Sequence, residues 1–502
     1  MNKEKTCITD KLETSCCTGC GACINCCPVD ALSYGRDPWG YYIPVADKEK
    51  CIGCGKCLSV CPVYNRKENG HFEQPRCHAF ISGNADELNA SSSGGIFTRF
   101  SQAVFEKGGI VYGAAWSGTL KEDHLVRHEA AETETELGKL KKSKYLQSYI
   151  GYTYRDIQDD LKAGRQVLFT GCPCQVAGLK ALLGTEDPNL LTIDLLCGNS
   201  PSEQFFRGYL SENFGDGAIR YEFRHKENDW RSDCVCITLE NGEEKVFTGR
   251  FEDDFQSVYH DHTMCPPHCE NCCFHSVPRQ GDLTIGDFWG IMRTDPSIPG
   301  QNGVSVILVN SEKGQEFFDR FGKREGDYLR EVPLAWLGGN GYTGKQSRNF
   351  ASPLRDRFYE DYLKHGFTVA VHRAAKTKNR NEIDKWFGYF EVLLRWMQKP
   401  DPVGWLRNRV EECGYERIAI YGMGEVGRLL YEKMKSASIP VEYAIDKRPQ
   451  KVDGQLKVVR PGDELEPVDV IIVSILSEFD GIRKLLEKKT DAKIISIRDF
   501  LL

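Results

Sequence analysis

The chain has 502 residues, enough for two to four domains, and its 40% hydrophobic content predicts packed cores. The net charge of -7 comes from acidic and basic residues mixed along the chain, which argues against a nucleic-acid surface. A polar start and the lack of a run of about eighteen apolar residues predict a cytoplasmic protein without a membrane span. Twenty-two cysteines in such a protein indicate metal or redox chemistry rather than disulfides.

One cysteine pattern is written twice near the N-terminus: Cys17-x2-Cys20-x2-Cys23-x3-Cys27-Pro28, then Cys51-x2-Cys54-x2-Cys57-x3-Cys61-Pro62. In this spacing three thiolates hold one iron–sulfur cube, and the fourth cysteine reaches the cube of the other repeat. We therefore predict two 4Fe-4S clusters, one on Cys17, Cys20, Cys23 and Cys61, the other on Cys51, Cys54, Cys57 and Cys27. A zinc site would not explain the third cysteine at the same spacing in each repeat, or the Cys-Pro that follows it. Disulfides would need an oxidising compartment. Exposed low-potential clusters would also indicate an anaerobic host.

The alternation of apolar segments predicts an α/β multidomain chain. Residues 1–66 are expected to form a ferredoxin-like α+β module and residues 77–373 a central α/β core. Early in the core, three serines and two glycines (Ser91 to Gly95) precede a helix predicted over 96–107. Such a loop either only caps the helix or offers free N–H groups to a phosphate or a cofactor.

Two cysteines follow successive strands of the predicted core. Cys174 comes after the strand 166–170, at or near the start of a helix, where its thiolate is favoured. Cys197 comes after the strand 190–196. Because the ends of neighbouring parallel strands share one edge of a sheet, we expect both thiols to face one crevice.

A third cysteine group, Cys269-x2-Cys272, has two interpretations. One is a local zinc knuckle that uses nearby histidines, namely His260, His262, His268 and His275. The other is a third iron–sulfur cluster, assembled from Cys174, Cys197, Cys269 and Cys272.

The C-terminal part reads as a separate unit. Residues 382–398 form an aromatic helix predicted to dock between domains or between subunits, so a homo-oligomer stays open. Residues 413–502 are predicted to form a Rossmann-like parallel sheet. A strand is followed there by a glycine loop and a helix, and the next strand ends in an acidic residue, which is the context of a dinucleotide fingerprint carried by Gly422, Gly424, Gly427 and Asp446. The alternative is the same fold without a ligand.

From Cys77 to about Arg373 the chain resembles the beta-subunit family of deazaflavin-coenzyme hydrogenases and dehydrogenases, iron–sulfur flavoproteins that also include a plant chlorophyll-cycle reductase. The matching blocks are SSSGGIFTRF, GGIVYGA, SKYLQS, LFTGCPCQVAGLK, DLLCGNSPS, CENC and GDLTIGDFWG.

The resemblance implies FAD, or FMN, held against a core cluster on Cys174, Cys197, Cys269 and Cys272. The flavin contacts that it implies are Ser92, Ser93, Gly94, Gly95, Ser143, Lys144, Gln147, Ser148, Thr170 and Gln175. Two departures stand against it. Cys172 occupies a position where the family often has another residue, so it competes with Cys174 as a ligand. The segment DLLCGN lacks the histidine often seen after its cysteine.

These parts predict an oxidoreductase in which electrons from reduced ferredoxin, or from a deazaflavin or nicotinamide donor, pass through the clusters to a flavin that reduces or oxidises a small organic substrate. A cationic Lys144 would stabilise a reduced, anionic flavin, unless it is an ordinary surface lysine. Asp287 is a second catalytic candidate, in the same crevice. The C-terminal unit resembles small domains found with sugar-modifying enzymes, which makes NAD or a nucleotide sugar a further expected ligand. The alternatives are an electron-transfer subunit without its own substrate and a non-catalytic, cluster-bearing sensor or interaction protein.

Overall fold

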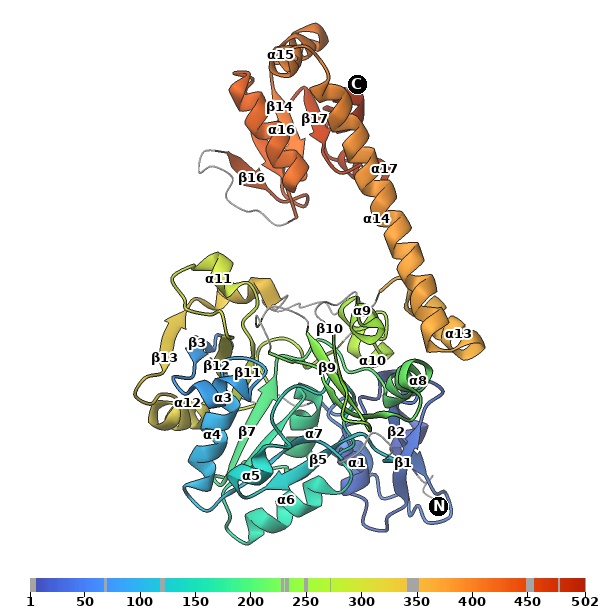
Figure 1. Ribbon diagram of the computed structural model, residues 1–502, viewed down its shortest axis with the longest axis vertical. Helices are drawn as coiled ribbons and strands as arrows, with labels where there is room; N and C mark the ends of the chain where they lie inside the picture. The colour runs from blue at the N-terminus through green and yellow to red at the C-terminus, as the bar shows by residue number, and fades with distance from the viewer. Residues whose placement is uncertain are drawn as a thin grey trace. The chain divides into compact units, whose positions relative to one another are not determined.

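The computed structural model describes residues 6–66, 70–117, 122–226, 230, 234–247, 252–270, 272–340, 352–447, 456–476 and 479–501. The chain divides into two compact units, Met1–Ala374 and Ala375–Leu502 (Figure 1). Within the described residues, no helix is both long and apolar enough to cross a bilayer.

The N-terminal cysteine-rich segment is a small α+β module, coloured dark blue in Figure 1. Its strands β1 (Leu32–Arg36) and β2 (Tyr42–Ala46) pair antiparallel, with Leu32 opposite Ala46. Its helical turns are η1 (Ile8–Asp10), η2 (Thr14–Cys16), α1 (Ala22–Asn25) and α2 (Lys56–Ser59). The module lies in the same compact unit as the core, where α1 packs against α7 (Pro173–Leu183).

A mixed sheet forms the centre of the first unit. In the described residues it has eight strands in the order β13-β3-β12-β11-β7-β6-β4-β5. β4, β6, β7 and β11 run parallel to one another, and the outer strands pair antiparallel. The bounds are β3 Arg76–Ile81, β4 Ile110–Trp116, β5 Val126–Ala131, β6 Val167–Gly171, β7 Leu190–Leu195, β11 Leu283–Asp287, β12 Ser305–Val309 and β13 Tyr328–Val332.

Helices cover both faces of this sheet. Successive strand residues point to opposite sides, so the apolar residues of one strand contribute to a core on each face. Leu168 packs in the core beneath α4 (Ile96–Phe105) and α12 (Glu312–Phe321). Its neighbours Val167 and Phe169 pack beneath α6 (Thr153–Lys162) and α7, in a core that also includes Ala22 of the N-terminal module. All five residues of β6 are buried, and most are apolar, as expected for a strand covered on both faces.

The remaining elements of the first unit surround this sheet. A separate antiparallel sheet contains β8 (Ala218–Glu222), β9 (Val235–Leu239) and β10 (Glu244–Phe247). The other helices are α3 Ala85–Asn89, α5 Glu134–Leu137, α8 Glu203–Phe214, α9 Asp254–His260, α10 Pro267–Glu270, α11 Ile291–Thr294, η3 Leu334–Asn340 and α13 Arg355–His365.

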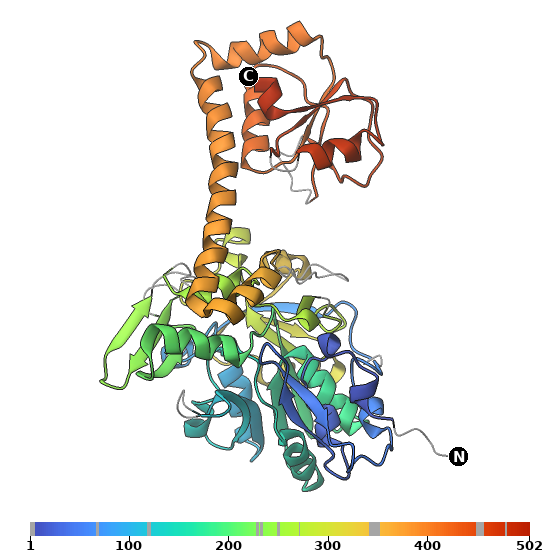
Figure 2. The ribbon, with the colours of Figure 1, turned by 90° about the vertical axis from the view of Figure 1, so that its right-hand side faces the viewer.

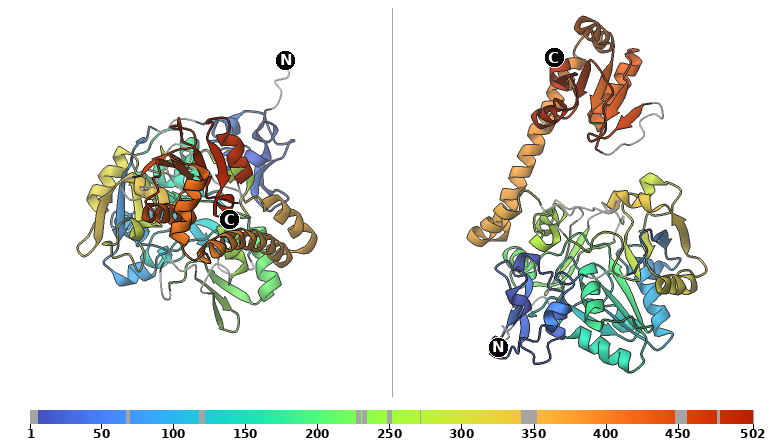
Figure 3. Two further views of the ribbon diagram at one scale, coloured as in Figure 1. Left: turned by 90° about the horizontal axis from the view of Figure 1, so that it is seen from above. Right: turned by 180° about the vertical axis from the view of Figure 1, so that it is seen from behind.

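The second unit is a parallel sheet with helices, as predicted for 413–502 (Figure 3, red). Its strand order is β16-β15-β14-β17-β18, and every pair is parallel. The bounds are α15 Pro402–Cys413, β14 Ile418–Tyr421, α16 Glu425–Ser436, β15 Tyr443–Ile445, β16 Lys457–Val459, β17 Val470–Val473, α17 Phe479–Leu486, β18 Lys493–Ser496 and α18 Ile497–Leu501.

The helix predicted over 382–398 is the end of a longer helix, α14 (Phe367–Met397), which Figure 2 shows without a break. The side chains of 376–388, 390 and 391 lie outside the described ones. Val392 and Trp396 are buried in the core of the second unit, and the Tyr389 hydroxyl accepts a hydrogen bond from the Leu476 N–H at 3.2 Å. This end of α14 therefore belongs structurally to the second unit.

Candidate functional site

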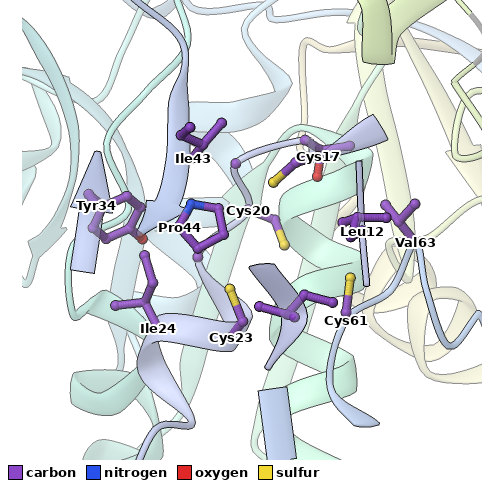
Figure 4. A pocket seen from close by; sticks show the side chains of 14 residues that line it. Leu12, Cys17, Cys20, Cys23, Ile24, Tyr34, Ile43, Pro44, Cys61 and Val63 are labelled. Carbon is purple, nitrogen blue, oxygen red and sulfur yellow. The ribbon is translucent and has the colours of Figure 1, made fainter. Parts of the chain in front are cut away.

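Four thiols from both cysteine repeats line one pocket in the N-terminal module. Cys17, Cys20 and Cys23 of the first repeat meet Cys61 of the second, and Figure 4 shows their sulfurs directed toward a common space. The backbone reaches this arrangement at Gly19 and Gly21, whose φ angles of 65° and 79° are left-handed. The pocket brings together the set that the crossing rule predicts for one cluster.

The surroundings of these four thiols are apolar, with Ile24, Ile43 and Val63 in the wall. Burial raises the pKa of Cys17 to about 11 and that of Cys20 to about 12. Thiols in such a place become thiolates when a metal compensates the charge. No group of Cys, His, Asp or Glu in the described part of the chain is spaced to hold a single metal ion. Four buried thiols are the donor set that the predicted 4Fe-4S cluster needs.

The second predicted set lies nearer the surface. Cys54 is exposed, while Cys57 is buried and packs in one cluster with the partly buried Cys27 and Cys51. Backbone amides already point at two of the sulfurs: the Ala31 N–H donates to Cys27 Sγ (3.2 Å) and the Ile8 N–H to Cys57 Sγ (3.3 Å). Amide hydrogen bonds of this kind support thiolate ligands.

A third thiol set gathers in the core from separate parts of the chain. Cys174 lies in the first turn of α7, Cys197 follows β7, and Cys269 and Cys272 lie in and after α10. Burial raises the pKa of Cys174 well above that of a free thiol, and the charges of Cys272, Cys197 and Cys269 raise it further. Cys197, Cys269 and Cys272 also interact with one another, so each pair of the four thiols lies within the range of electrostatic interaction.

The core thiol set adjoins the first pocket. Cys20 also contributes to the raised pKa of Cys174, and a Cβ placed on Gly178 of α7 would lie 3.0 Å from Cys20 Sγ. The absent side chain at Gly178 lets the N-terminal module approach α7 at this point. The pocket of Cys17, Cys20, Cys23 and Cys61 and the core thiol set are therefore neighbours through direct packing.

A cavity of about 690 Å³ opens at the carboxyl ends of the parallel strands, within the size range of small-molecule sites. Most of the predicted flavin contacts line it: Ser92, Ser93, Gly95, Ser143, Lys144, Ser148, Thr170 and Gln175, together with Asp287. The serine loop and the basic segment meet there, since Ser143 donates from both its N–H (2.8 Å) and its hydroxyl (3.0 Å) to Ser92 Oγ.

Two predicted flavin contacts lie elsewhere. Gly94 packs between strands, where its N–H donates to Ser305 Oγ (2.8 Å) and a Cβ would lie 2.2 Å from the Phe80 carbonyl oxygen. Gln147 joins the core to the N-terminal module: its Oε1 accepts the Tyr42 N–H (2.7 Å) and its Nε2 donates to the Thr18 carbonyl (3.3 Å). Sequence blocks do not distinguish such packing positions from ligand contacts.

Lys144 lines the cavity with its ammonium group tied to backbone. Its Nζ donates to the carbonyl oxygens of Lys139 (2.9 Å) and Lys141 (2.8 Å). Burial lowers the pKa of Lys144 to about 7, an effect that the more distant Glu129 only partly offsets. An anionic ligand in the cavity would return Lys144 to its charged form.

The Asp287 carboxylate is already engaged by other residues. Trp230 Nε1 donates to its Oδ1 at 3.2 Å, and the Arg224 guanidinium lies 3.6 Å from its Oδ2. The rings of Trp230 and Trp289 stack with centroids 4.9 Å apart, and the guanidinium lies 4.8 Å above Trp289. Asp287 thus holds an aromatic and cationic wall of the cavity in place.

Sequence reasoning missed Arg224 and Trp230, and it considered His262 only as a zinc ligand, whereas His262 lines the cavity. These residues stand on irregular segments, where no periodic pattern marks a side chain as buried or exposed. The histidine–cysteine zinc knuckle is not formed in the described residues, because no such group is spaced for one ion. His262 instead contacts the Asn199 side chain, with Nδ1 and Nδ2 3.0 Å apart.

The C-terminal glycine loop has the geometry of a tight strand-to-helix turn. Gly422 has a left-handed φ of 90°, and a Cβ on Gly427 would lie 1.9 Å from the Gly422 carbonyl oxygen. Gly424 faces open space. Asp446 turns back on the loop, where its Oδ2 accepts the Met423 N–H at 2.6 Å.

Comparison with known proteins gave two family matches. Residues 164–333 match the family described as the C terminus of the coenzyme F420 hydrogenase/dehydrogenase beta subunit, and residues 16–65 match the 4Fe-4S dicluster domain. No curated protein sequence matched the chain. Among solved structures, the F420-reducing NiFe hydrogenase complex from Methanosarcina barkeri, studied with xenon, is 16% identical, with a TM-score of 0.37. That match covers 64% of this chain and 96% of the other. Residues 164–333 are therefore similar to the C-terminal part of coenzyme F420 hydrogenase and dehydrogenase beta subunits, and residues 16–65 are similar to a 4Fe-4S dicluster domain.

Proposed function

We propose that the chain is an iron–sulfur flavoprotein oxidoreductase. It takes electrons from reduced ferredoxin, or from a deazaflavin or nicotinamide donor, and reduces or oxidises a small organic substrate in the core cavity. One observation carries the proposal: Cys20 of the first pocket packs on Gly178 of α7, the helix whose first turn carries Cys174, and Cys197 lines the cavity. When bound, the clusters carry single electrons and the flavin exchanges electrons in pairs with an organic molecule.

Two walls of the cavity would bind different ligands, one the cofactor and the other the substrate. Ser92, Ser143 and the start of α4 offer hydroxyl and amide donors to an anionic cofactor. Lys144 adds a positive charge once an anion is near. The wall of Trp230, Trp289 and Arg224 is suited to a planar substrate.

The cysteines supply ligands in three sets, as the sequence predicts: the N-terminal pair of clusters and a core cluster on Cys174, Cys197, Cys269 and Cys272. The support for the core set is the mutual proximity of its four thiols. In the second unit, the tight turn at Gly422 and Gly427 supports a nucleotide site, with NAD or a nucleotide sugar as the ligand class.

The test is anaerobic purification with iron, sulfide and flavin quantification, followed by a screen of ferredoxin, deazaflavin and NAD(P)H as donors. We expect about twelve irons, because each cubane carries about four, and one flavin per chain. The Cys197→Ala variant should lose about four irons and keep about eight. Cys77→Ala is the matched control, since Cys77 is a buried thiol in β3 whose pKa no other cysteine shifts.

Three results would change the proposal. About eight irons in the unaltered protein would remove the core cluster. Bound flavin with turnover only in the presence of a partner protein would indicate an electron-transfer subunit, the function that the family match also suits. Absence of flavin and of any turnover would indicate a sensor or interaction protein.

A further inference from the structure

Lys226 is a partly buried lysine to which the proposed function gives no role. It follows β8 and is not one of the residues that line the cavity. Its Nζ donates to the carbonyl oxygens of Leu88 (2.7 Å), Ser93 (2.7 Å) and Asn302 (2.9 Å). An ammonium group has three N–H donors, so these three hydrogen bonds use all of them.

The three carbonyl groups come from separate segments that meet at the serine loop, residues 91–95. One belongs to α3, one to the loop itself and one to the turn that precedes β12. Within the loop, Ser93 has two further contacts. Its hydroxyl donates to the Val304 carbonyl at 2.7 Å, and the Ser91 hydroxyl lies 2.8 Å from its carbonyl oxygen. Lys226 therefore ties a loop of the cavity wall to its neighbouring segments.

Two contacts fix the direction of the Ser93 carbonyl. Because Lys226 does not line the cavity, its bond directs this oxygen away from the cavity. Gly303 packs against the same oxygen: it has a φ of 117°, and a Cβ placed on it would lie 2.7 Å away. A carbonyl oxygen carries a partial negative charge, so this orientation keeps that charge away from an anionic ligand.

The loop offers its N–H groups to the cavity instead. Ser92, Ser93 and Gly95 line the cavity, and in the described part of the chain none of their amides donates to a protein acceptor. Helix α4 begins directly after Gly95, and its N-terminus adds the positive end of a helix dipole. Amides that are free on one side of a loop form a concave site for an anion.

We propose that Lys226 is a positioning residue for the flavin: it holds the Ser93 carbonyl away from the cavity, so that the serine loop offers amide donors to the phosphate groups of FAD. The proposal rests on the proposed function, in which the cavity holds a flavin. Lys226 does not touch the flavin and acts through the loop. Without the ammonium, the Ser93 carbonyl loses a charge-assisted hydrogen bond and is free to turn toward the phosphates, which it repels.

The test compares FAD with riboflavin, which has the same ring system but no phosphate, by fluorescence titration of the whole flavin-depleted protein. The titrations are done at pH 6, where Lys144 is charged. In Lys226→Met we expect the Kd for FAD to rise about tenfold and the Kd for riboflavin to change by less than about twofold. Iron content should stay as in the unaltered protein.

The matched control is Lys489→Met in the second unit. The Lys489 Nζ also bridges backbone, since it donates to the carbonyl oxygens of Pro461 (2.8 Å) and Gly462 (3.0 Å). Both Kd values should be unchanged in this variant, because the lost bonds lie outside the unit that contains the cavity.

A second variant, Gly303→Ala, keeps Lys226 and displaces the same carbonyl from its other side, so it should also weaken FAD binding selectively. An unchanged Kd for FAD in Lys226→Met would overturn the proposal, and so would equal weakening of FAD and riboflavin, which indicates general loss of structure. A selective loss in Lys226→Met but not in Gly303→Ala would assign the effect to charge and overturn the positioning role. If the unaltered protein binds neither flavin, the proposed function itself fails, and this inference with it.

Discussion

The two units of this chain share a local motif, in which a strand ends at a glycine and leads through a turn into a helix. In the core, β6 ends at Gly171 and α7 follows with Cys172 as its N-cap. In the second unit, β14 leads through Gly422 to α16 with Gly424 as its N-cap. Both turns place a helix N-terminus at the carboxyl end of a parallel strand.

The surroundings of the two turns differ. In the core, other segments supply thiols from β7 and α10, and a cavity of about 690 Å³ opens beside them. In the second unit, the loop amide of Met423 is taken by Asp446, and the Ser474 hydroxyl donates to the Gly422 carbonyl at 2.7 Å. A strand–glycine–helix turn alone therefore does not make a functional site. Residues distant in sequence decide whether reactive or ligand-binding groups lie beside it.

The largest expected effect is at the second turn, in Gly427→Ala. The added Cβ would lie 1.9 Å from the Gly422 carbonyl oxygen, so strand and helix must move apart. We expect the second unit to lose ~3 kcal/mol of unfolding free energy, the upper range for overpacked sites. Calorimetry of the full chain should show one transition shifted to lower temperature, with iron and flavin content unchanged.

The matched control is Gly424→Ser in the same loop. A Cβ there meets no heavy atom within 4 Å, and serine is a favoured N-cap residue, so the change in unfolding free energy should stay within about 0.5 kcal/mol. Loss of iron from Gly427→Ala would contradict the expectation that a change in the second unit leaves the cysteine sites of the first unit intact.

A smaller effect is expected at the first turn's helix, in Gly178→Val. The new side chain would press on Cys20, whose Sγ lies 3.0 Å and whose Cβ lies 3.1 Å from the position of the added Cβ. We expect a cost of ~1–3 kcal/mol and easier loss of iron from the set of Cys17, Cys20, Cys23 and Cys61 on incubation with a chelator.

The control for that variant is Ala181→Val, which adds a similar branched side chain to a half-buried site on the same helix. Equal iron loss in both variants would mean that added bulk on α7, rather than its contact with Cys20, loosens the cluster.

The sequence predicts well the features that depend on local order. The strand predicted over 166–170 corresponds to β6 (Val167–Gly171), and the predicted glycine turn of the second unit has Gly422 with a left-handed φ of 90°. The crossing of Cys61 into the pocket of the first repeat also has the expected arrangement.

Features that depend on tertiary contacts are less accessible to sequence reasoning. Gln147 lies in the block SKYLQS, for which the family resemblance implies flavin contacts, yet its side-chain amide forms hydrogen bonds with the N-terminal module. Arg224 and Trp230 line the cavity from an irregular segment without a repeat to mark them. The choice between Cys172 and Cys174 as a ligand likewise depends on tertiary contacts, since Cys174 interacts electrostatically with Cys197, Cys269 and Cys272 while Cys172 also interacts with Cys197.

The third expected effect, on ligand binding rather than on stability, is a pH dependence of flavin affinity at the core cavity. In the ligand-free protein the pKa of Lys144 is about 7, so above pH 7 the side chain must take up a proton when an anionic flavin binds. Between pH 7 and 9 the Kd for FAD should therefore rise by up to about tenfold per pH unit, and below pH 7 it should be flat.

The Lys144→Met variant should bind FAD more weakly at pH 6, and its Kd should not depend on pH in this way. Lys141→Met removes another lysine that lines the cavity and should keep the slope. A slope that survives in Lys144→Met, measured by fluorescence titration at constant ionic strength, would assign the proton to another group and separate Lys144 from the flavin site.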